Sequence, residues 1–81
     1  DSSSVRDRMV ALASLRNVSA TEAMPLIKKV LNDESLQIRS MAVFALGIKQ
    51  TEESYPILLD LLINEADYGI RADAAGALGY L

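Results

Sequence analysis

Residues 33–47, which read DESLQIRSMAVFALG, decide the fold of this 81-residue chain. Within them, Ile38, Ala42, Ala45 and Leu46 are spaced i, i+4, i+7 and i+8, so they share one face of a helix. Such an apolar stripe has to be buried against another element. The segment therefore predicts an amphipathic helix that packs on a neighbour.

A similar pattern recurs before and after this segment. The pairs Val5-Arg6, Ile38-Arg39 and Ile70-Arg71 stand 33 and 32 residues apart, and each opens a run of small and apolar residues. A period in this range, with helical patterning in each unit, is typical of an α-solenoid built from stacked helix pairs. We expect one all-α domain made of two full repeats and the first helix of a third. The domain covers 1–81, and its units span about 1–33, 34–65 and 66–81.

The ends of these first helices carry their own signals. Ser2, Ser35 and Asp67 each stand four residues before the repeated Arg, and their side-chain oxygens can accept a backbone N–H at a helix N-terminus. Gly47 and Gly79 stand eight residues after it, where a left-handed C-terminal turn favours glycine. We therefore expect the first helices of the second and third units to end at these glycines, whereas the first unit has Ser14 at this place.

Second helices are predicted between the first ones. Pro25 and Pro56 each precede an apolar run, and proline is tolerated in a first helical turn. Thr21 and Thr51 are the expected N-terminal caps, and the short linkers predict antiparallel hairpins. The five expected helices cover about 3–15, 22–32, 36–47, 52–64 and 68–79.

Composition narrows the classes of function. The chain has 51% apolar and 23% charged residues, and charge interrupts every apolar run well before the length of a membrane span. It has no Cys and no His, so we expect no disulfide, no metal site and a cytoplasmic location. A net charge of −3, from 8 Lys and Arg against 11 Asp and Glu, argues against nucleic acid as a partner.

The chain resembles a known repeat family. Residues 33–47 look like the short HEAT-like repeat first recognised in phycobilisome bilin lyases of the E/Z type, and residues 70–79, IRADAAGALG, repeat that signature. The resemblance implies a right-handed α-solenoid of HEAT-like helix pairs over nearly the whole chain. It does not carry an activity with it, because the same module resembles parts of scaffolds that have nothing to do with pigments. In deoxyhypusine hydroxylases, HEAT-like repeats hold iron with His-Glu pairs, and the absence of His excludes that chemistry here.

The resemblance also implies a role for the repeated arginines. A cation in the first turn of a helix is mildly disfavoured by the helix dipole, so local electrostatics do not explain them. In HEAT repeats an Asp six residues earlier commonly meets such an Arg, and Asp33 has this offset from Arg39. For Arg71 the same offset gives Glu65, with Asp67 nearer. We expect a structural ladder between units that includes Asp33, Arg39 and Arg71.

Some apolar residues fall where the sister repeat carries a polar or small one, and these point to a binding surface. Leu59 aligns with Lys28, and Ile63 with Asn32. Most such residues are core, and apolar exposure matters only where it is contiguous. A second group pairs Met41 with Arg8 and Asp73, and Phe44 with Ala11 and Gly76. The expected partner-binding surface lies on the second helices, at Lys28, Lys29, Leu59, Asp60 and Ile63.

The function expected from these patterns is a non-catalytic scaffold for another protein. Carboxylate pairs such as Glu52-Glu53 stand at helix starts, where the dipole favours negative charge, and no catalytic residues are expected. The alternative, which comes only from the resemblance, is part of a phycobiliprotein bilin lyase or lyase-like chaperone. A bilin would be the cofactor only in that case, and its site would need Arg or Lys beside an aromatic-rich cleft, whereas aromatics make up 5% of the chain.

Two expectations concern the ends of the chain. Because the chain begins at Asp1 without an initiator Met, we expect it to be a piece of a longer solenoid. The helix at 68–79 has no successor to cover its outer face, and end repeats without a polar cap tend to associate. We therefore expect self-association through this helix.

Overall fold

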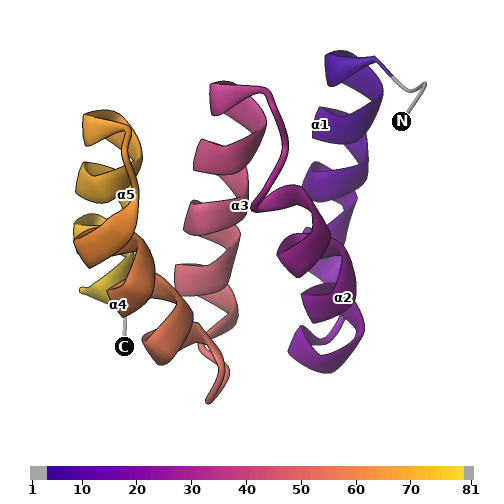
Figure 1. The fold of residues 1–81 in the computed structure, drawn as a ribbon. Helices are drawn as coiled ribbons and strands as arrows, with labels where there is room; N and C mark the ends of the chain where they lie inside the picture. The colour runs from indigo at the N-terminus through magenta and orange to yellow at the C-terminus, as the bar shows by residue number, and fades with distance from the viewer. Residues whose placement is uncertain (1–3, 80–81) are drawn as a thin grey trace.

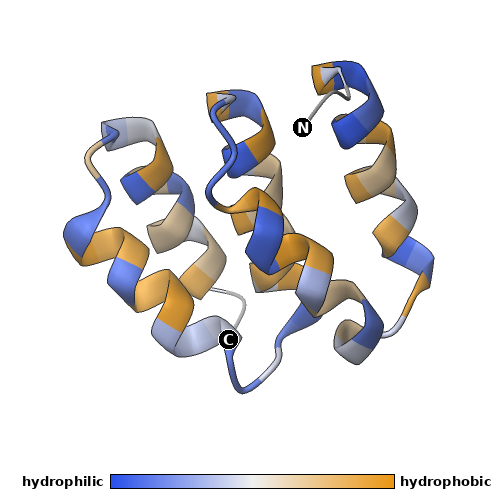
Figure 2. Cartoon of the chain, turned by 45° about the vertical axis from the view of Figure 1, so that its right-hand side comes forward, coloured by the Kyte–Doolittle hydropathy of each residue, from blue (hydrophilic) through white to orange (hydrophobic). Residues whose placement is uncertain are grey.

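The computed structural model describes residues 4–79, which form two layers of helices (Figures 1 and 2). The helices α1, α3 and α5 lie side by side, and α2 and α4 pack against one face of them. The central helix α3 contacts α1, α2, α4 and α5. The described elements are α1 (Val5–Ala13), the 3-10 helix η1 (Ser14–Asn17), α2 (Ala20–Val30), α3 (Leu36–Lys49), α4 (Ser54–Asn64) and α5 (Tyr68–Leu78). This part of the chain is an all-α solenoid of helix pairs, as predicted.

The core lies between the two layers. On α3, Ile38, Ala42 and Leu46 are fully buried, and so is Val43 on the side that faces α5. The second helices contribute Ile27 and Leu58, which are also fully buried. Figure 2 shows hydrophobic and hydrophilic residues alternating along the helices, as expected for helices with one buried face. The predicted buried stripe of α3 is confirmed except at Ala45, which is half-buried.

Side-chain caps begin most of the helices. Ser35 accepts from the backbone N–H of Ile38, and Asp67 accepts from that of Ile70, as predicted. The cap of α1 is Ser4, which accepts from Asp7 N, whereas the expected cap Ser2 lies outside the described residues. These bonds satisfy N–H groups that have no partner within the helix.

Three expectations about the starts of the second helices need correction. The cap of α2 is Ser19, which accepts from Glu22 N, so that Pro25 falls inside α2 rather than in its first turn. The expected cap Thr21 is therefore a helical residue. At α4 the N-cap position is Glu53 and not Thr51, although Thr51 and Ser54 bond reciprocally between backbone N–H and side-chain oxygen. Pro56 lies in the first turn, as expected.

The register of the first repeat also differs from the expectation. Arg8 lies four residues after the cap Ser4, and Arg39 stands in the same relation to Ser35. The alignment on Arg6 was therefore wrong, and Arg6 is exposed. The wrong alignment arose because Val5 precedes an Arg, as Ile38 does. Val5 is 38% exposed, however, while Ile38 is fully buried.

Aligning Arg8 with Arg39 changes which residues are equivalent. The offset of the first two units becomes 31, the same as the spacing of Pro25 and Pro56 in the second helices. Both helices of the unit then share one offset. In this register Phe44 is equivalent to Ala13 on α1 and to Gly76 on α5.

The glycines act through close packing rather than through a left-handed turn. Gly47 is a buried residue inside α3, which continues to Lys49 and ends at Gln50 in the left-handed conformation, with φ of 51°. A Cβ atom placed on Gly47 would lie 2.9 Å from the Cβ of Ala77. Gly79 has φ of −65°. The prediction of left-handed glycine turns was therefore wrong, and Gly47 instead lets α3 and α5 approach each other.

Candidate functional site

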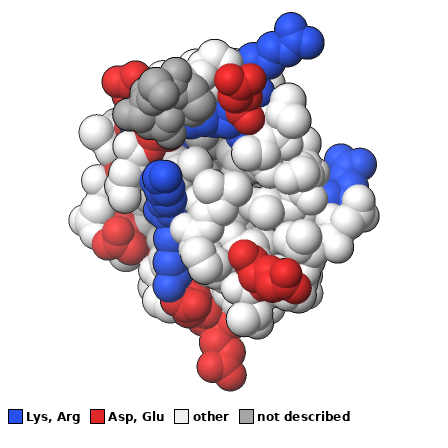
Figure 3. All heavy atoms as spheres, turned by 90° about the vertical axis from the view of Figure 1, so that its right-hand side faces the viewer, with Lys and Arg blue, Asp and Glu red and all other residues white. Residues whose placement is uncertain are grey.

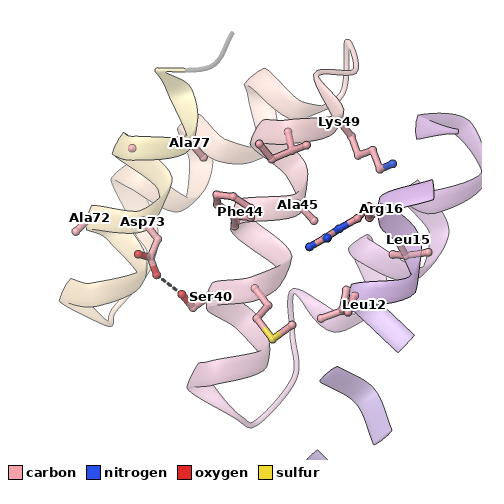
Figure 4. A pocket seen from close by; sticks show the side chains of 14 residues that line it. Leu12, Leu15, Arg16, Ser40, Phe44, Ala45, Lys49, Ala72, Asp73 and Ala77 are labelled. Carbon is pink, nitrogen blue, oxygen red and sulfur yellow. Dashed lines mark hydrogen bonds between the residues drawn. The ribbon is translucent and has the colours of Figure 1, made fainter. Parts of the chain in front are cut away.

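A cavity of about 770 Å³ opens on the outer side of the layer formed by α1, α3 and α5 (Figure 4). Its middle is α3, which contributes a second apolar stripe. Met41, Phe44, Ala45 and Ile48 have the spacing i, i+3, i+4 and i+7 and all line this cavity. We call this cavity the α3 groove. It lies on the face of α3 that is turned away from the core.

The two largest exposed side chains of this stripe are in contact with solvent. Phe44 is 57% exposed and Ile48 is 47% exposed. In α5 the positions equivalent to Met41 and Phe44 are Asp73 and Gly76, so α5 has no large apolar side chain at these two positions. A contiguous exposed apolar patch typically marks a binding surface.

The walls of the α3 groove differ on its two sides. On one side α5 contributes the small residues Ala72, Gly76 and Ala77. A Cβ atom placed on Gly76 would meet nothing within 4 Å, so there is open space over this part of α5. On the other side, Leu12 and Leu15 contribute larger aliphatic side chains. The groove is therefore an apolar surface with free room along α5.

Polar groups stand at the rim of the α3 groove. Ser40 donates its hydroxyl to a carboxylate oxygen of Asp73 at 2.6 Å, which links α3 to α5 (Figure 4). Arg16 on η1 is exposed, and its side chain reaches toward Ala45 (Figure 4). The amine of Lys49 donates to the carbonyl oxygen of Val18 at 2.6 Å. One end of the groove is therefore cationic, while Asp73 stands on the α5 side.

The repeated arginines form a chain of contacts elsewhere, on the loops that join the repeats. Arg8 approaches the Asp33 carboxylate with two nitrogens, Nε at 2.6 Å from Oδ2 and Nη2 at 3.1 Å from Oδ1. Arg39 donates from Nη1 to the backbone carbonyl oxygen of Asp33 at 3.2 Å. The expected contact of Arg39 with Asp33 is therefore made through the main chain, and the carboxylate pairs with Arg8.

The next loop repeats this geometry. Nη2 of Arg39 lies 3.9 Å from Oε2 of Glu65, and Arg71 donates from Nη1 to the carbonyl oxygens of Glu65 and Ala66 at 2.8 and 3.0 Å. Each loop carboxylate thus faces the Arg of its own unit, while the loop carbonyl faces the Arg of the next. Each loop thus bonds to arginines of two successive units, because it lies between the ends of their first helices.

The surroundings of Asp33 favour its charged form. The backbone N–H of Ser35 donates to its Oδ1 at 2.9 Å, and this bond lowers the pKa of the Asp33 carboxyl below its ordinary value. The Arg8 guanidinium lowers the pKa further, and desolvation opposes both effects. Asp33 therefore acts as an ionised group that holds a turn and a neighbouring cation together.

Two of the five residues expected to bind a partner line a common depression. Lys28 forms an ion pair with Glu53, and Asp60 accepts from the side chain of Asn64 at 2.7 Å. Lys28 and Asp60 line a smaller depression of about 420 Å³ between α2 and α4. The other three expected residues are absent from its lining. They are Lys29, Leu59 and Ile63.

Sequence reasoning noticed part of the α3 groove but not its extent. Met41 and Phe44 stood out as apolar residues with polar or small counterparts, whereas Arg16 and Lys49 did not. The i, i+3, i+4, i+7 spacing from Met41 to Ile48 was the signal that could have revealed a second apolar face.

The described residues contain no group of three or more His, Cys, Asp or Glu side chains placed to hold a metal ion. None of their helices combines the length and hydropathy that crossing a membrane requires.

On the face over α1 and α2, acidic and basic side chains surround a largely uncharged centre (Figure 3). The described residues visible on that face form no continuous cationic surface.

Comparison with known proteins agrees with this architecture. No curated protein and no solved structure matches the chain. The family model for HEAT repeats matches residues 1–79, which is nearly the whole chain. Together with the paired helices of the fold, this match establishes that the chain belongs to the HEAT-repeat family.

Proposed function

We propose that this chain is a non-catalytic scaffold that holds another protein in the α3 groove. The observation that carries the proposal is the second apolar stripe of α3, because Phe44 and Ile48 remain exposed although the helix already has a buried face. HEAT repeats are generally protein-interaction scaffolds, which supports the class of function. Apolar centres with polar rims are typical of such interfaces.

The α3 groove is a better candidate than the α2 and α4 surface. The apolar residues of the groove are contiguous, while Leu59 and Ile63 lie outside the depression lined by Lys28 and Asp60. Lys28 is also engaged with Glu53. Binding energy is usually concentrated in a few apolar or aromatic anchors near the centre of an interface, and Phe44 has that position in the groove.

The resemblance to bilin lyases suggests a pigment as an alternative occupant, but the lining does not suit one. Phe44 is the only aromatic side chain among the described lining residues. A tetrapyrrole would need several aromatic contacts for its rings. We therefore propose a protein and not a bilin as the occupant.

A second copy of the chain is the further partner that we propose, on a different surface. Val43 and Gly47 of α3 are buried, and Gly47 lies directly against Ala77 of α5. The equivalent residues of α5, Ala75 and Gly79, are exposed. The outer face of α5 thus repeats the surface on which α3 receives α5, so another copy can pack on it.

A display library of random peptides tests the proposed groove directly. Peptides enriched on the wild-type chain should lose binding to Gly76→Leu, which fills the open space over Gly76, and keep binding to Leu59→Lys on α4. Gly76 is exposed in a helix interior, so the leucine should not unfold the chain. Peptides that bind Gly76→Leu as well as the wild type would place the interface outside the groove.

A further inference from the structure

We infer that the α3 groove takes a short amphipathic helix whose acidic end faces Arg16 and Lys49. This inference rests on the proposed function, and it adds the conformation and the charge of the bound segment. Three features support it. The groove has an apolar middle, it has a cationic end, and its middle offers no hydrogen-bond partners to the backbone of a bound extended peptide.

The apolar middle of the groove favours a helix over an extended peptide. An extended segment would bring backbone N–H and C=O groups onto Phe44, Ala45 and Ile48, which cannot bond to them. Unpartnered buried backbone groups are costly, and a helix satisfies its own. The described residues contain no strand whose edge could pair with an added one. Of the polar rim groups, Ser40 and Asp73 already bond to each other.

The length of the α3 groove sets the length of the segment. Its α3 residues run from Ser40 to Lys49, a distance of about 13–14 Å along a helix. A partner helix of about nine residues spans this distance. It would present aliphatic residues at i, i+3, i+4 and i+7, and one of them would fill the open space over Gly76.

The charge of the rim sets the chemistry of one end of the segment. Arg16 takes part in none of the ion pairs among the described residues, and its guanidinium reaches toward the α3 groove (Figure 4). Lys49 adds a second cation at the same end, although the chain as a whole has a net charge of −3. A Glu or Asp side chain at that end of the partner helix is therefore favoured, and a cation is not.

Fluorescence anisotropy with two designed peptides tests the inference on the full chain. Both probes have about 14 residues, roughly four helical turns, with Leu at i, i+3, i+4 and i+7 in an Ala-rich sequence. One ends in two Glu residues and its twin in two Gln residues. The Glu peptide should bind about three- to tenfold more tightly at low salt, and added salt should reduce this difference.

Charge-reversal variants locate the acidic end. Arg16→Glu should remove the preference for the Glu peptide, whereas Lys29→Glu, the same charge change at an exposed position on α2, should preserve it. Gly76→Leu should prevent binding of both peptides. Phe44→Ala should weaken both by about thirtyfold, as expected for a central anchor. Thermal unfolding of each variant shows whether the fold is retained.

Each part of the inference can fail separately. Equal binding of the two peptides, or equal effects of Arg16→Glu and Lys29→Glu, would refute the proposal that the bound segment has an acidic end. A Glu peptide that carries a central proline and still binds as tightly would refute the proposal that the bound segment is helical. If neither peptide binds while library peptides still depend on Gly76, the inference fails and the proposed function stands. Binding of the peptides to Gly76→Leu at wild-type strength would overturn both.

Discussion

Nε of Arg8 lies 2.6 Å from Oδ2 of Asp33, and both side chains are nearly buried, with 12% and 10% of their surfaces exposed. The same Asp33 offers its backbone carbonyl oxygen to Arg39. One loop residue therefore bonds to the first helices of two successive repeats. Since helix pairs in a solenoid contact only their neighbours, such a loop fixes how one unit sits on the next.

Removal of the Arg8 side chain should destabilise the chain. Arg8→Ala leaves a nearly buried carboxylate without its cation, which we expect to reduce the free energy of unfolding by about 1–3 kcal/mol. Arg6→Ala is the matched control, since Arg6 is exposed, and it should have almost no effect. Urea denaturation measures both variants. Equal losses for Arg6→Ala and Arg8→Ala would contradict the corrected register.

The contribution of Asp33 should depend on pH. Its pKa is lowered in the folded state from an ordinary value of 3.8, so ionisation of Asp33 stabilises the fold above that value. This stabilisation is lost as the pH falls through the lowered folded pKa. The stability difference between the wild type and Asp33→Asn should be largest near neutral pH and shrink below about pH 4. Urea denaturation at several pH values checks this, and a difference that stays constant down to about pH 2 would argue against the ionised pair.

Gly47 and Gly76 should respond to alanine in opposite directions. Gly47→Ala forces a Cβ atom against Ala77, and we expect this overpacking to cost about 1–3 kcal/mol although alanine favours helix. Gly76→Ala places the same atom in open space and should stabilise the chain by about 0.5–1 kcal/mol. Thermal unfolding of the two variants provides the comparison. A stabilised Gly47→Ala would show that α3 and α5 do not approach as described.

The sequence predicted the fold because the repeats carry redundant signals. The buried stripe from Ile38 to Leu46 and the caps Ser35 and Asp67 agree with one another, so each helix was predicted by more than one feature. The first repeat was misaligned because Val5-Arg6 imitates Ile38-Arg39 locally. The cap Ser4 and the contact of Arg8 with Asp33, which is 25 residues away, distinguish the two alignments.

The candidate site was harder to predict than the fold. Whether an apolar residue is core or surface depends on which neighbours cover it, and spacing alone does not contain this information. Ala45 belonged to the expected buried stripe, yet it is half-buried and lines the α3 groove. Gly47 was expected in a turn because glycine favours both left-handed backbone and close packing. The distance to Ala77 shows which of the two applies.

Self-association should follow from the exposed face of α5. The wild-type chain should form dimers or larger species as its concentration rises from micromolar to millimolar, because Ala75 and Gly79 expose the surface that α3 buries. Ala75→Glu should reduce this association by adding charge to the contact. Sedimentation equilibrium measures both proteins. A monomeric wild type over the whole concentration range would refute the prediction.

We propose that the α3 groove, and not the surface of the second helices, holds the partner. Peptide binding to Gly76→Leu and Leu59→Lys tests this most directly, with thermal unfolding measured alongside. We expect both variants to remain folded, Gly76→Leu to lose the peptides enriched on the wild type, and Leu59→Lys to retain them. The reverse pattern, with binding kept by a folded Gly76→Leu and lost by a folded Leu59→Lys, would contradict the account and place the interface on α4.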